Sequence, residues 1–481
     1  MSNYERGYAD VFLCPKLPQA NFNNTLVGVI QKLAQKDVLP LSLIADDFPV
    51  IKPQRQDEES YPIGSGRNPA TVLEKQMTVG AGTIPEKTIF GLMIPRIGGN
   101  VTFTETAKEI WTIVAVAKAS ITTGTYVEFD VVAAGGVITK YQGWFDKNGD
   151  GATDKPANST GYKALRTMFD MDISAAVTAQ QVADVITAAI TALADVAAAD
   201  GGGTTTTVTV TNDQNGAVDD AHDYNSGLVV ATTQQGRTKV EIEFTADDFE
   251  NQNFGIHVQR LLATYDRILD LYGITIATYE MKCEDGGVAE EDVNLMVSSY
   301  ILGDSLSKPR GPDGVVWVKG INPFSNFKKN YGWQSFNENF TLTYGAAILR
   351  IIKGFSVKIE NEMKHNHDGG GIFASGVDVG KRSIDVGLNT ITKDNILFVL
   401  ADTHINDYAA ALVCQIKSIR GADTNDYVQW DFSSLRVLPI DEKIASADEW
   451  MERYDIVVKP APNCVSKATI EGYMSAEYFG D

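Results

Sequence analysis

Two short stretches decide the fold of this chain: FSVKIE at residues 355–360 and SIDVGL at residues 383–388. In both, apolar side chains alternate with polar side chains or glycine. Such alternation is typical of a strand with one face in a core and the other in water. The two stretches therefore predict a half-buried β-hairpin around a long tip.

Strand patterns continue on either side of this hairpin. We expect strands at residues 267–282 and 293–302, joined by an acidic turn, and a further pair at residues 411–419 and 427–438. A short helix is expected at residues 394–401. Because the later strand pair repeats the pattern of the earlier one, the sequence predicts a tandem duplication.

The region nearer the N-terminus has a different character. Residues 1–60 have the composition of an extended arm, because one amphipathic stretch is followed by three prolines and a charged run. We then expect a hairpin with strands at residues 71–79 and 87–94, turning at the glycines and the proline between them. Residues 249–262 are expected to form a helix.

Residues 108–238 are rich in Ala, Thr and Gly, and we interpret them as an inserted module of about 130 residues. Thr178 and Gln181 form a capping box for a helix predicted at residues 178–199, with apolar side chains on one face. A run of three glycines ends this helix. Strands are expected at residues 110–117, 126–132, 205–211 and 228–233.

The predicted fold is mainly β. It consists of two tandem units of the β-sandwich or barrel type, each with long hairpins, and one inserted α+β unit. The predicted boundaries are residues 1–60 for the N-terminal arm, 61–107 with 239–310 for the first unit, 108–238 for the inserted module, and 311–481 for the second unit with a C-terminal arm.

The 481-residue composition excludes several classes of protein. Asp and Glu number 62 against 41 Lys and Arg, which gives a net charge of -21. A protein that grips DNA or RNA needs an excess of positive charge, so this class is excluded. The four cysteines are too widely spaced for a zinc site or a disulfide scaffold, which favours a reducing compartment. No window approaches the roughly 20 apolar residues that span a bilayer, and no signal peptide is evident.

Two strings have the residue types of a metal site. The string DKNGDGATD at residues 146–154 matches the first half of a calcium loop, but position twelve is Ala157 rather than Glu. An Asx-rich turn is the alternative. The candidate calcium ligands are Asp146, Asn148, Asp150 and Asp154. The other string holds His365 and His367 before a glycine-rich tip, with His404 as a third candidate zinc ligand.

The sequence lacks the motifs of common enzymes. It contains no nucleophile elbow, no Walker A string and no dinucleotide-binding glycine pattern at a helix start. We therefore predict a protein without enzymatic activity and without a cofactor.

A resemblance to a known family rests on three features: the hairpin at residues 355–388, the helix at 394–401, and the paired strands that end in RVLP at 436–439. These resemble the tail tube (major tail) proteins of long-tailed bacteriophages. The inserted module, with WFD at 144–146, its predicted helix and VVATTQQG at 229–236, is similar to an accessory domain of many phage virion proteins. Together the likeness covers roughly residues 61–460.

This resemblance implies a structural role in the virion tail, after assembly in the host cytoplasm. Hairpins of neighbouring copies would join into a ring, and stacked rings would form a tube through which DNA passes without sequence-specific binding. Two tube units in one chain imply a trimeric ring, with a hexamer as the alternative. The implied partners are other tail proteins, such as the tape measure, terminator and baseplate proteins. The implied inner wall consists of residues 71–79, 87–94, 355–362 and 377–388.

Carboxylates on that wall would repel DNA phosphates, so that a duplex passes without sticking. The candidate lumen-facing residues are Glu74, Glu360, Glu362, Asp378 and Asp385. The inserted module would face outward, because it is too large for a DNA channel.

Two other functions remain open. One is another phage structural component, such as a capsid decoration, baseplate or attachment protein, that uses the inserted module. The other is a metal-dependent hydrolase that uses His365, His367 and His404. Ring formation by the purified protein distinguishes the first alternative, and metal content distinguishes the second.

Overall fold

The computed structural model describes residues 9–14, 39–40, 53–55, 58–60, 70–72, 77–87, 91, 93–158, 166–201, 205–244, 255–261, 266–283, 289–303, 333–345, 347–349, 352–366, 376–390, 396–403, 409–420, 423–439, 454–461 and 466–473. Most of these residues lie in strands, and nearly all the strand pairings are antiparallel. The buried apolar side chains form two separate clusters, one in a large sandwich and one in the inserted module.

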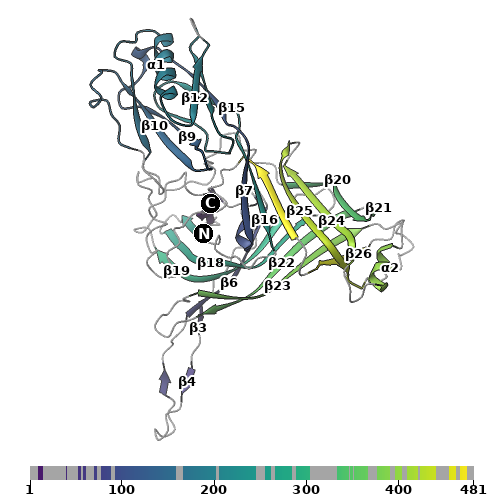
Figure 1. The fold of residues 1–481 in the computed structure, drawn as a ribbon. Coiled ribbons are helices and arrows are strands. Elements are labelled where there is room, and N and C mark those ends of the chain that lie inside the picture. Colours follow the sequence, from purple (N-terminus) through teal and green to yellow (C-terminus); the bar gives the residue numbers. More distant parts are fainter. Residues whose placement is uncertain are drawn as a thin grey trace, which may run out of the picture.

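The sandwich has two antiparallel layers (Figure 1). The first layer contains, in spatial order, β7 (Asn100–Ala107), β16 (Arg237–Glu243), β27 (Ser466–Gly472), β25 (Asp423–Val437), β24 (Ala409–Arg420) and β20 (Trp333–Tyr344). The second contains β26 (Tyr454–Pro460), β23 (Gly376–Thr390), β22 (Ile352–Asn366), β18 (Asp266–Cys283), β19 (Glu290–Gly303) and β6 (Met77–Lys87). The layers are joined at β25, which pairs with β27 in the first layer and with β26 in the second.

Shorter elements surround these layers. They are β1 (Ala9–Cys14), β2 (Leu39–Pro40), β3 (Pro53–Arg55), β4 (Glu58–Ser60), β5 (Ala70–Val72), β17 (Gly255–Leu261), β21 (Ala347–Leu349), α2 (Ile396–Thr403) and a 3₁₀ turn at Ile94–Ile97. The strand β17 extends the sheet by pairing with both β18 and β1.

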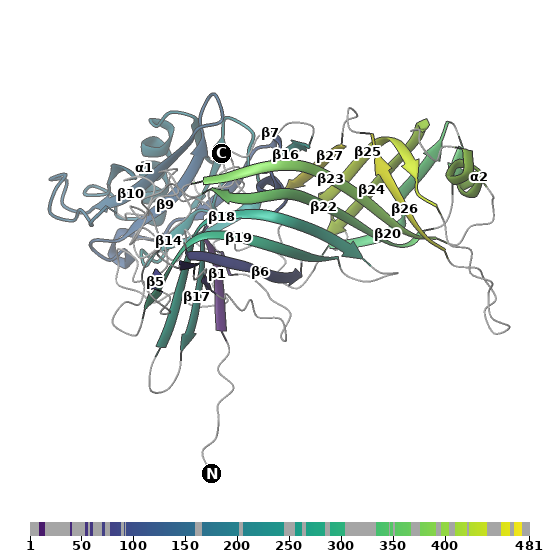
Figure 2. The same ribbon diagram turned by 90° about the horizontal axis from the view of Figure 1, so that it is seen from below.

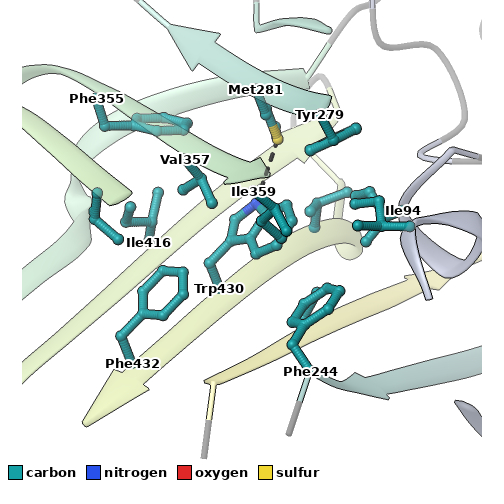
Figure 3. Packing of buried hydrophobic residues seen from close by; sticks show 14 of the residues in the cluster. Ile94, Phe244, Tyr279, Met281, Phe355, Val357, Ile359, Ile416, Trp430 and Phe432 are labelled. Carbon is teal, nitrogen blue, oxygen red and sulfur yellow. Dashed lines mark hydrogen bonds between the residues drawn. The ribbon is translucent and has the colours of Figure 1, made fainter. Parts of the chain in front are cut away.

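The core of the sandwich lies between the two layers, where alternate residues of each strand point inward (Figure 3). Trp430 of β25 lies at its centre and is fully buried. Its Nε1 donates a hydrogen bond to Met281 Sδ of the opposite layer, 3.3 Å away. Tyr279, two residues before Met281, has its ring centroid 6.0 Å from that of Trp430. The side chain of Trp430 therefore contacts both layers and stabilises their packing.

The hairpin predicted from residues 355–360 and 383–388 is confirmed. It is formed by β22 and β23, and the register places Phe355 opposite Leu388 and Val357 opposite Val386. All four side chains are buried. The strands predicted at residues 267–282, 293–302, 411–419 and 427–438 and the helix predicted at 394–401 are confirmed as well. The mainly β fold with an inserted α+β unit follows from these elements.

The hairpin predicted at residues 71–79 and 87–94 is wrong. The predicted turn lies inside one continuous strand, β6, which pairs antiparallel with β19. Pro85 is tolerated there because β6 is at the edge of the sheet, where a missing N–H breaks no ladder. In the described chain, residues 80–87 have a strand partner on one side only. Residues 94–97 form a 3₁₀ turn instead of a strand end.

The helix predicted at residues 249–262 is wrong too, because residues 255–261 form the strand β17. Apolar Ile256 and Val258 alternate with polar residues, which is the period of a strand. Pairing with β1 on one side and β18 on the other satisfies the backbone of this segment. The tertiary pairing therefore overrides the local preference for a helix.

The inserted module contains two four-stranded sheets and the helix α1 (Ala179–Thr191), and it projects from the sandwich at β7 and β16 (Figure 1). One sheet contains β11 (Thr167–Asp172), β10 (Ile138–Asp146), β9 (Tyr126–Val132) and β14 (His222–Tyr224). The other contains β12 (Val196–Asp200), β13 (Thr207–Asn212), β8 (Ile110–Val114) and β15 (Val229–Gln234). The four strands predicted in this module are confirmed.

The helix α1 is shorter than the predicted range of 178–199. Its apolar face, with Val182, Ile186 and Ile190, is buried in the module core. After Thr191 the chain turns through Asp195, which has a left-handed φ of 64°. This turn reverses the chain, so residues 196–200 return as β12 and pair with β13.

The cap of α1 gives a direct test of this helix start. Thr178 accepts a hydrogen bond from Gln181 N at 3.3 Å, and Gln181 Oε1 accepts one from Thr178 N at 3.1 Å. We expect Thr178→Ala to lower the opening free energy of α1 by about 1 kcal/mol, because a backbone donor loses its partner. Hydrogen-exchange mass spectrometry of peptides that cover α1 measures this. Thr178→Ser is the control, and an unchanged exchange rate in Thr178→Ala would contradict the cap.

Candidate functional site: the ribbon face and its open edges

Two long ribbons lie side by side in the second layer of the sandwich (Figure 2). One is the pair β18–β19 and the other the pair β22–β23. The two are joined by antiparallel pairing of β18 with β22, from Thr278 opposite Glu360 to Cys283 opposite Phe355. The strand β6 continues this sheet beyond β19. The result is a five-stranded curved surface, extended by β26 at one end of β23, with one face in the core and one face outward.

The outward face, called here the ribbon face, carries the polar residues of the alternating pattern. Its acidic members are Glu280, Glu290, Asp292, Glu360, Glu362 and Asp385, and its basic members include Lys282, Lys358 and Lys459. Lys358 lies opposite both Glu280 and Asp385 in the strand register. The ribbon face is therefore a lattice of mixed charge rather than a uniformly acidic surface.

Two ion pairs on the ribbon face have clear geometry. Lys358 Nζ is 2.5 Å from Glu360 Oε1, and Lys459 Nζ is 2.7 Å from Asp385 Oδ1. The hydrogen bond to Glu360 raises the pKa of Lys358 above its ordinary value. Since these side chains are half exposed, solvent screens the pairs, and each contributes little to stability. Their significance lies in the charge pattern that they present to a partner.

The structure describes the side chains of three of the five residues that were predicted to face a lumen. Glu360 and Asp385 lie on the ribbon face with a lysine beside each, and Glu362 is exposed further along β22. The backbone of Asp378 belongs to β23, and its side chain lies outside the described part of the molecule. Glu74 lies outside the described residues.

The lysines of the ribbon face were not predicted as part of a site. Their signal was present in the sequence, because the hairpin register that pairs Val357 with Val386 also sets Lys358 opposite Asp385. Lys459 could not be found in this way, since its strand β26 lies about seventy residues further along the chain than β23.

Two strands of this surface have open edges. In the described chain, residues 80–87 of β6 have no strand partner on the side away from β19. On the opposite side of the surface, β23 pairs with β26 only from Val386 to Thr390, so residues 376–385 have one strand partner, β22, among the described residues. As far as the structure describes the chain, each edge presents N–H and C=O groups without a strand partner, and such groups can template another strand.

In the predicted calcium loop, the carboxylates accept hydrogen bonds from backbone N–H groups of the same turn. Asp146 is buried, and it accepts hydrogen bonds from the backbone N–H groups of Asn148, Gly149 and Gly151 at 3.0, 2.7 and 2.7 Å. Asp150 accepts from Ala152 N and Thr153 N, and Asp154 accepts from Lys147 N. These are the contacts of an Asx-rich turn. Within the described ranges, no three His, Cys, Asp or Glu side chains are grouped to hold a metal ion.

The histidines of the alternative zinc site are not brought together by the described residues. The backbone of His365 belongs to β22, whereas His367 and His404 lie outside the described part of the chain. Among the elements that the structure describes, no helix has the length and apolar character needed to cross a membrane.

No protein-family model matches this sequence, and no curated protein is significantly similar to it.

Proposed function

We propose that this protein is a structural component of a phage virion that assembles into stacked rings and forms the tail tube. The observation that carries the proposal is the ribbon face bounded by two open edges, on β6 and β23. An exposed edge is a liability in a monomer, and pairing between copies removes it. The resemblance in the hairpin at residues 355–388 supports the same assignment.

The two edges lie on opposite sides of the surface, so they favour head-to-tail association. In such an interface the β6 edge of one copy pairs with the β23 edge of the next, and rotation closes a ring. The strand order β23, β22, β18, β19, β6 contains four successive antiparallel pairs. Consequently β6 and β23 run in the same direction, and the junction between two copies would be parallel. A trimer is the favoured ring and a hexamer the alternative.

The mixed charge of the ribbon face makes the wall of the proposed lumen less acidic than the carboxylates alone would make it. Lys358 and Lys459 neutralise part of the charge of Glu360 and Asp385. A wall that is close to neutral gives passing DNA neither a strong attraction nor a strong barrier. The net charge of -21 per chain still disfavours tight binding of nucleic acid.

Electron microscopy and sedimentation of the purified protein test the proposal. We expect rings or hollow cylinders, favoured by raised ionic strength because salt screens the repulsion between acidic copies. We expect Thr83→Pro, at the open edge of β6, to remain monomeric, since proline removes a backbone donor there. Thr83→Ala keeps the donor and should assemble like the natural protein.

Three outcomes distinguish the alternatives. A natural protein that stays monomeric at all concentrations would contradict tube formation and favour a decoration or attachment role. Assembly of Thr83→Pro into normal rings would show that β6 does not form the junction. Stoichiometric zinc in the purified protein would favour the metal-dependent alternative.

A further inference from the structure

The ribbon formed by β22 and β23 changes character where it leaves the core of the sandwich. Its inward-facing row begins with three apolar cross-strand pairs, namely Phe355 with Leu388, Val357 with Val386, and Ile359 with Ile384. The next pair in this row is Asn361 with Arg382. An amide and a guanidinium therefore occupy positions where the alternation would continue with apolar side chains. Polar groups at such positions lose water on folding and have to be compensated by hydrogen bonds.

Asn361 lies at the fork where the two ribbons separate. Among the described residues, the pairing of β22 with β18 ends at Glu360 opposite Thr278. A bulge in β18 lies at the same point, since its register against β19 shifts between Ile276 and Thr278. The side chain of Asn361 is buried, and its Nδ2 donates to Ile276 O at 3.1 Å and to Ile97 O at 2.9 Å. One amide thus supplies donors to a carbonyl of β18 and to a carbonyl of the 3₁₀ turn that precedes β7.

Arg382 connects this amide to the opposite layer of the sandwich. Its Nε donates to Asn361 Oδ1 at 2.7 Å, and its Nη1 donates to Phe244 O at 3.0 Å. Phe244 directly follows β16 of the first layer, and Cζ of Arg382 lies over its ring, 5.9 Å from the centroid. A guanidinium has only donors, so the Oδ1 atom of Asn361 faces Arg382 while Nδ2 faces the two carbonyls. Hydrogen bonds from a charged donor are stronger than neutral ones.

Arg382 belongs to the half of β23 that has β22 as its one described strand partner, residues 376–385. Next to Arg382 the hairpin register shifts, because Gly380 and Lys381 are opposite the single residue Glu362. A bulge of this kind bends a strand and disrupts its ladder locally. The direction of this half of β23 is therefore not fixed by the ladder alone.

We propose that Asn361 and Arg382 are positioning residues that fix the direction in which this half of β23 leaves the sandwich. The pair ties it to β18, to the turn before β7 and to the end of β16. The inference rests on the proposed function in one respect, namely that the edge held in this way is the one offered to a neighbouring copy. A partner strand can pair with an edge that is already in place without first having to order it.

Hydrogen-exchange mass spectrometry of the full chain, at a dilution where it is monomeric, tests the positioning. Arg382→Met removes the guanidinium donors and keeps a long stem that can continue the apolar row, so it should fold. We expect the amides of residues 376–385 to exchange at least about tenfold faster than in the natural protein, because two charge-assisted hydrogen bonds are lost. Peptides from the centre of β25 should exchange at the natural rate.

Lys381→Met is the matched control. It removes the same charge from the neighbouring position, where the side chain is exposed. We expect exchange at residues 376–385 to change by less than about twofold in this variant, because an exposed side chain holds nothing in place.

Asn361→Leu tests the other half of the pair. Leucine is similar in shape to asparagine, but it donates no hydrogen bond to Ile276 O or Ile97 O. We expect residues 376–385 to exchange at least about tenfold faster in this variant as well. Sedimentation then measures assembly: the concentration needed for rings should rise at least about tenfold in Arg382→Met and Asn361→Leu, and less than about threefold in Lys381→Met.

Several outcomes would overturn the proposal. Unchanged exchange at residues 376–385 in Arg382→Met would show that the guanidinium does not hold the edge. Equally faster exchange in β25 would mean a global loss of stability, and an equal effect of Lys381→Met would mean a charge effect. Rings of natural stability from Arg382→Met would refute the role of the pair in assembly. Exchange is measured on the monomer, so a natural protein that forms no rings contradicts the proposed function and leaves the exchange test valid.

Discussion

Replacing Trp430 with alanine is expected to lower the free energy of unfolding of the sandwich by about 4 kcal/mol. The side chain is fully buried between the two layers (Figure 3). Its ring stacks on Phe244 at 5.9 Å and on Phe432 at 6.2 Å between centroids. Removal of the indole loses these contacts and leaves a cavity that rigid strands on both sides cannot fill.

Urea denaturation followed by circular dichroism, at a dilution where the protein is monomeric, measures this loss. Val413→Ala is the matched control, because Val413 lies on the neighbouring strand β24 and is 37% exposed. We expect the control to change the unfolding free energy by less than about 0.5 kcal/mol. A loss below about 1 kcal/mol in Trp430→Ala would show that the two layers are not held together through this residue.

The second large expected effect is a pH dependence of the folding stability, and it is caused by Glu291. This carboxyl is buried in the sandwich core, where it accepts a hydrogen bond from Tyr279 Oη at 2.6 Å. Burial raises its pKa to about 7. The folded protein therefore keeps the proton up to about pH 7, whereas the unfolded chain releases it near the ordinary value of 4.5. Between these values stability falls as pH rises, by about 3 kcal/mol in total, and above pH 7 the loss is complete.

Glu291→Gln removes this titration and keeps an oxygen for Tyr279. We expect its stability advantage over the natural protein to grow from pH 4.5 to pH 7 and then to level off. Melting temperatures of both proteins across this range measure the difference. Glu290→Gln, on the opposite and solvated face of β19, is the control and should show no such growth. A constant difference between Glu291→Gln and the natural protein at all pH values would contradict a buried, protonated Glu291.

Local periodicity predicted the parts of the fold that alternate cleanly. Residues 355–360 and 383–388 repeat every second position, and both strands formed as expected. β6 was missed because its glycines and Pro85 are turn residues by preference, and only pairing with β19 keeps the segment extended. The end of α1 was missed because alanines favour a helix until Asp195 reverses the chain.

Local sequence patterns are limited in the same way for the candidate site. Glu360 and Asp385 could be assigned to one polar face because a single hairpin fixes their positions. Lys459, which pairs with Asp385, could not be assigned to that face, because its strand β26 joins β23 only in the folded molecule. Sequence patterns report neighbours along one strand or one hairpin, whereas an ion pair between strands far apart in the sequence is seen only in the folded molecule.

The strands β7 and β16, which bracket the inserted module, are themselves paired, with Ala107 opposite Arg237. Excision of residues 108–236 would leave two adjacent strand ends that a short turn can reconnect as an ordinary hairpin. Such a junction makes the module an exchangeable cassette. Recombination at this point can replace or remove the appendage while every contact of the sandwich core is preserved, so the two parts of the chain are free to evolve at different rates.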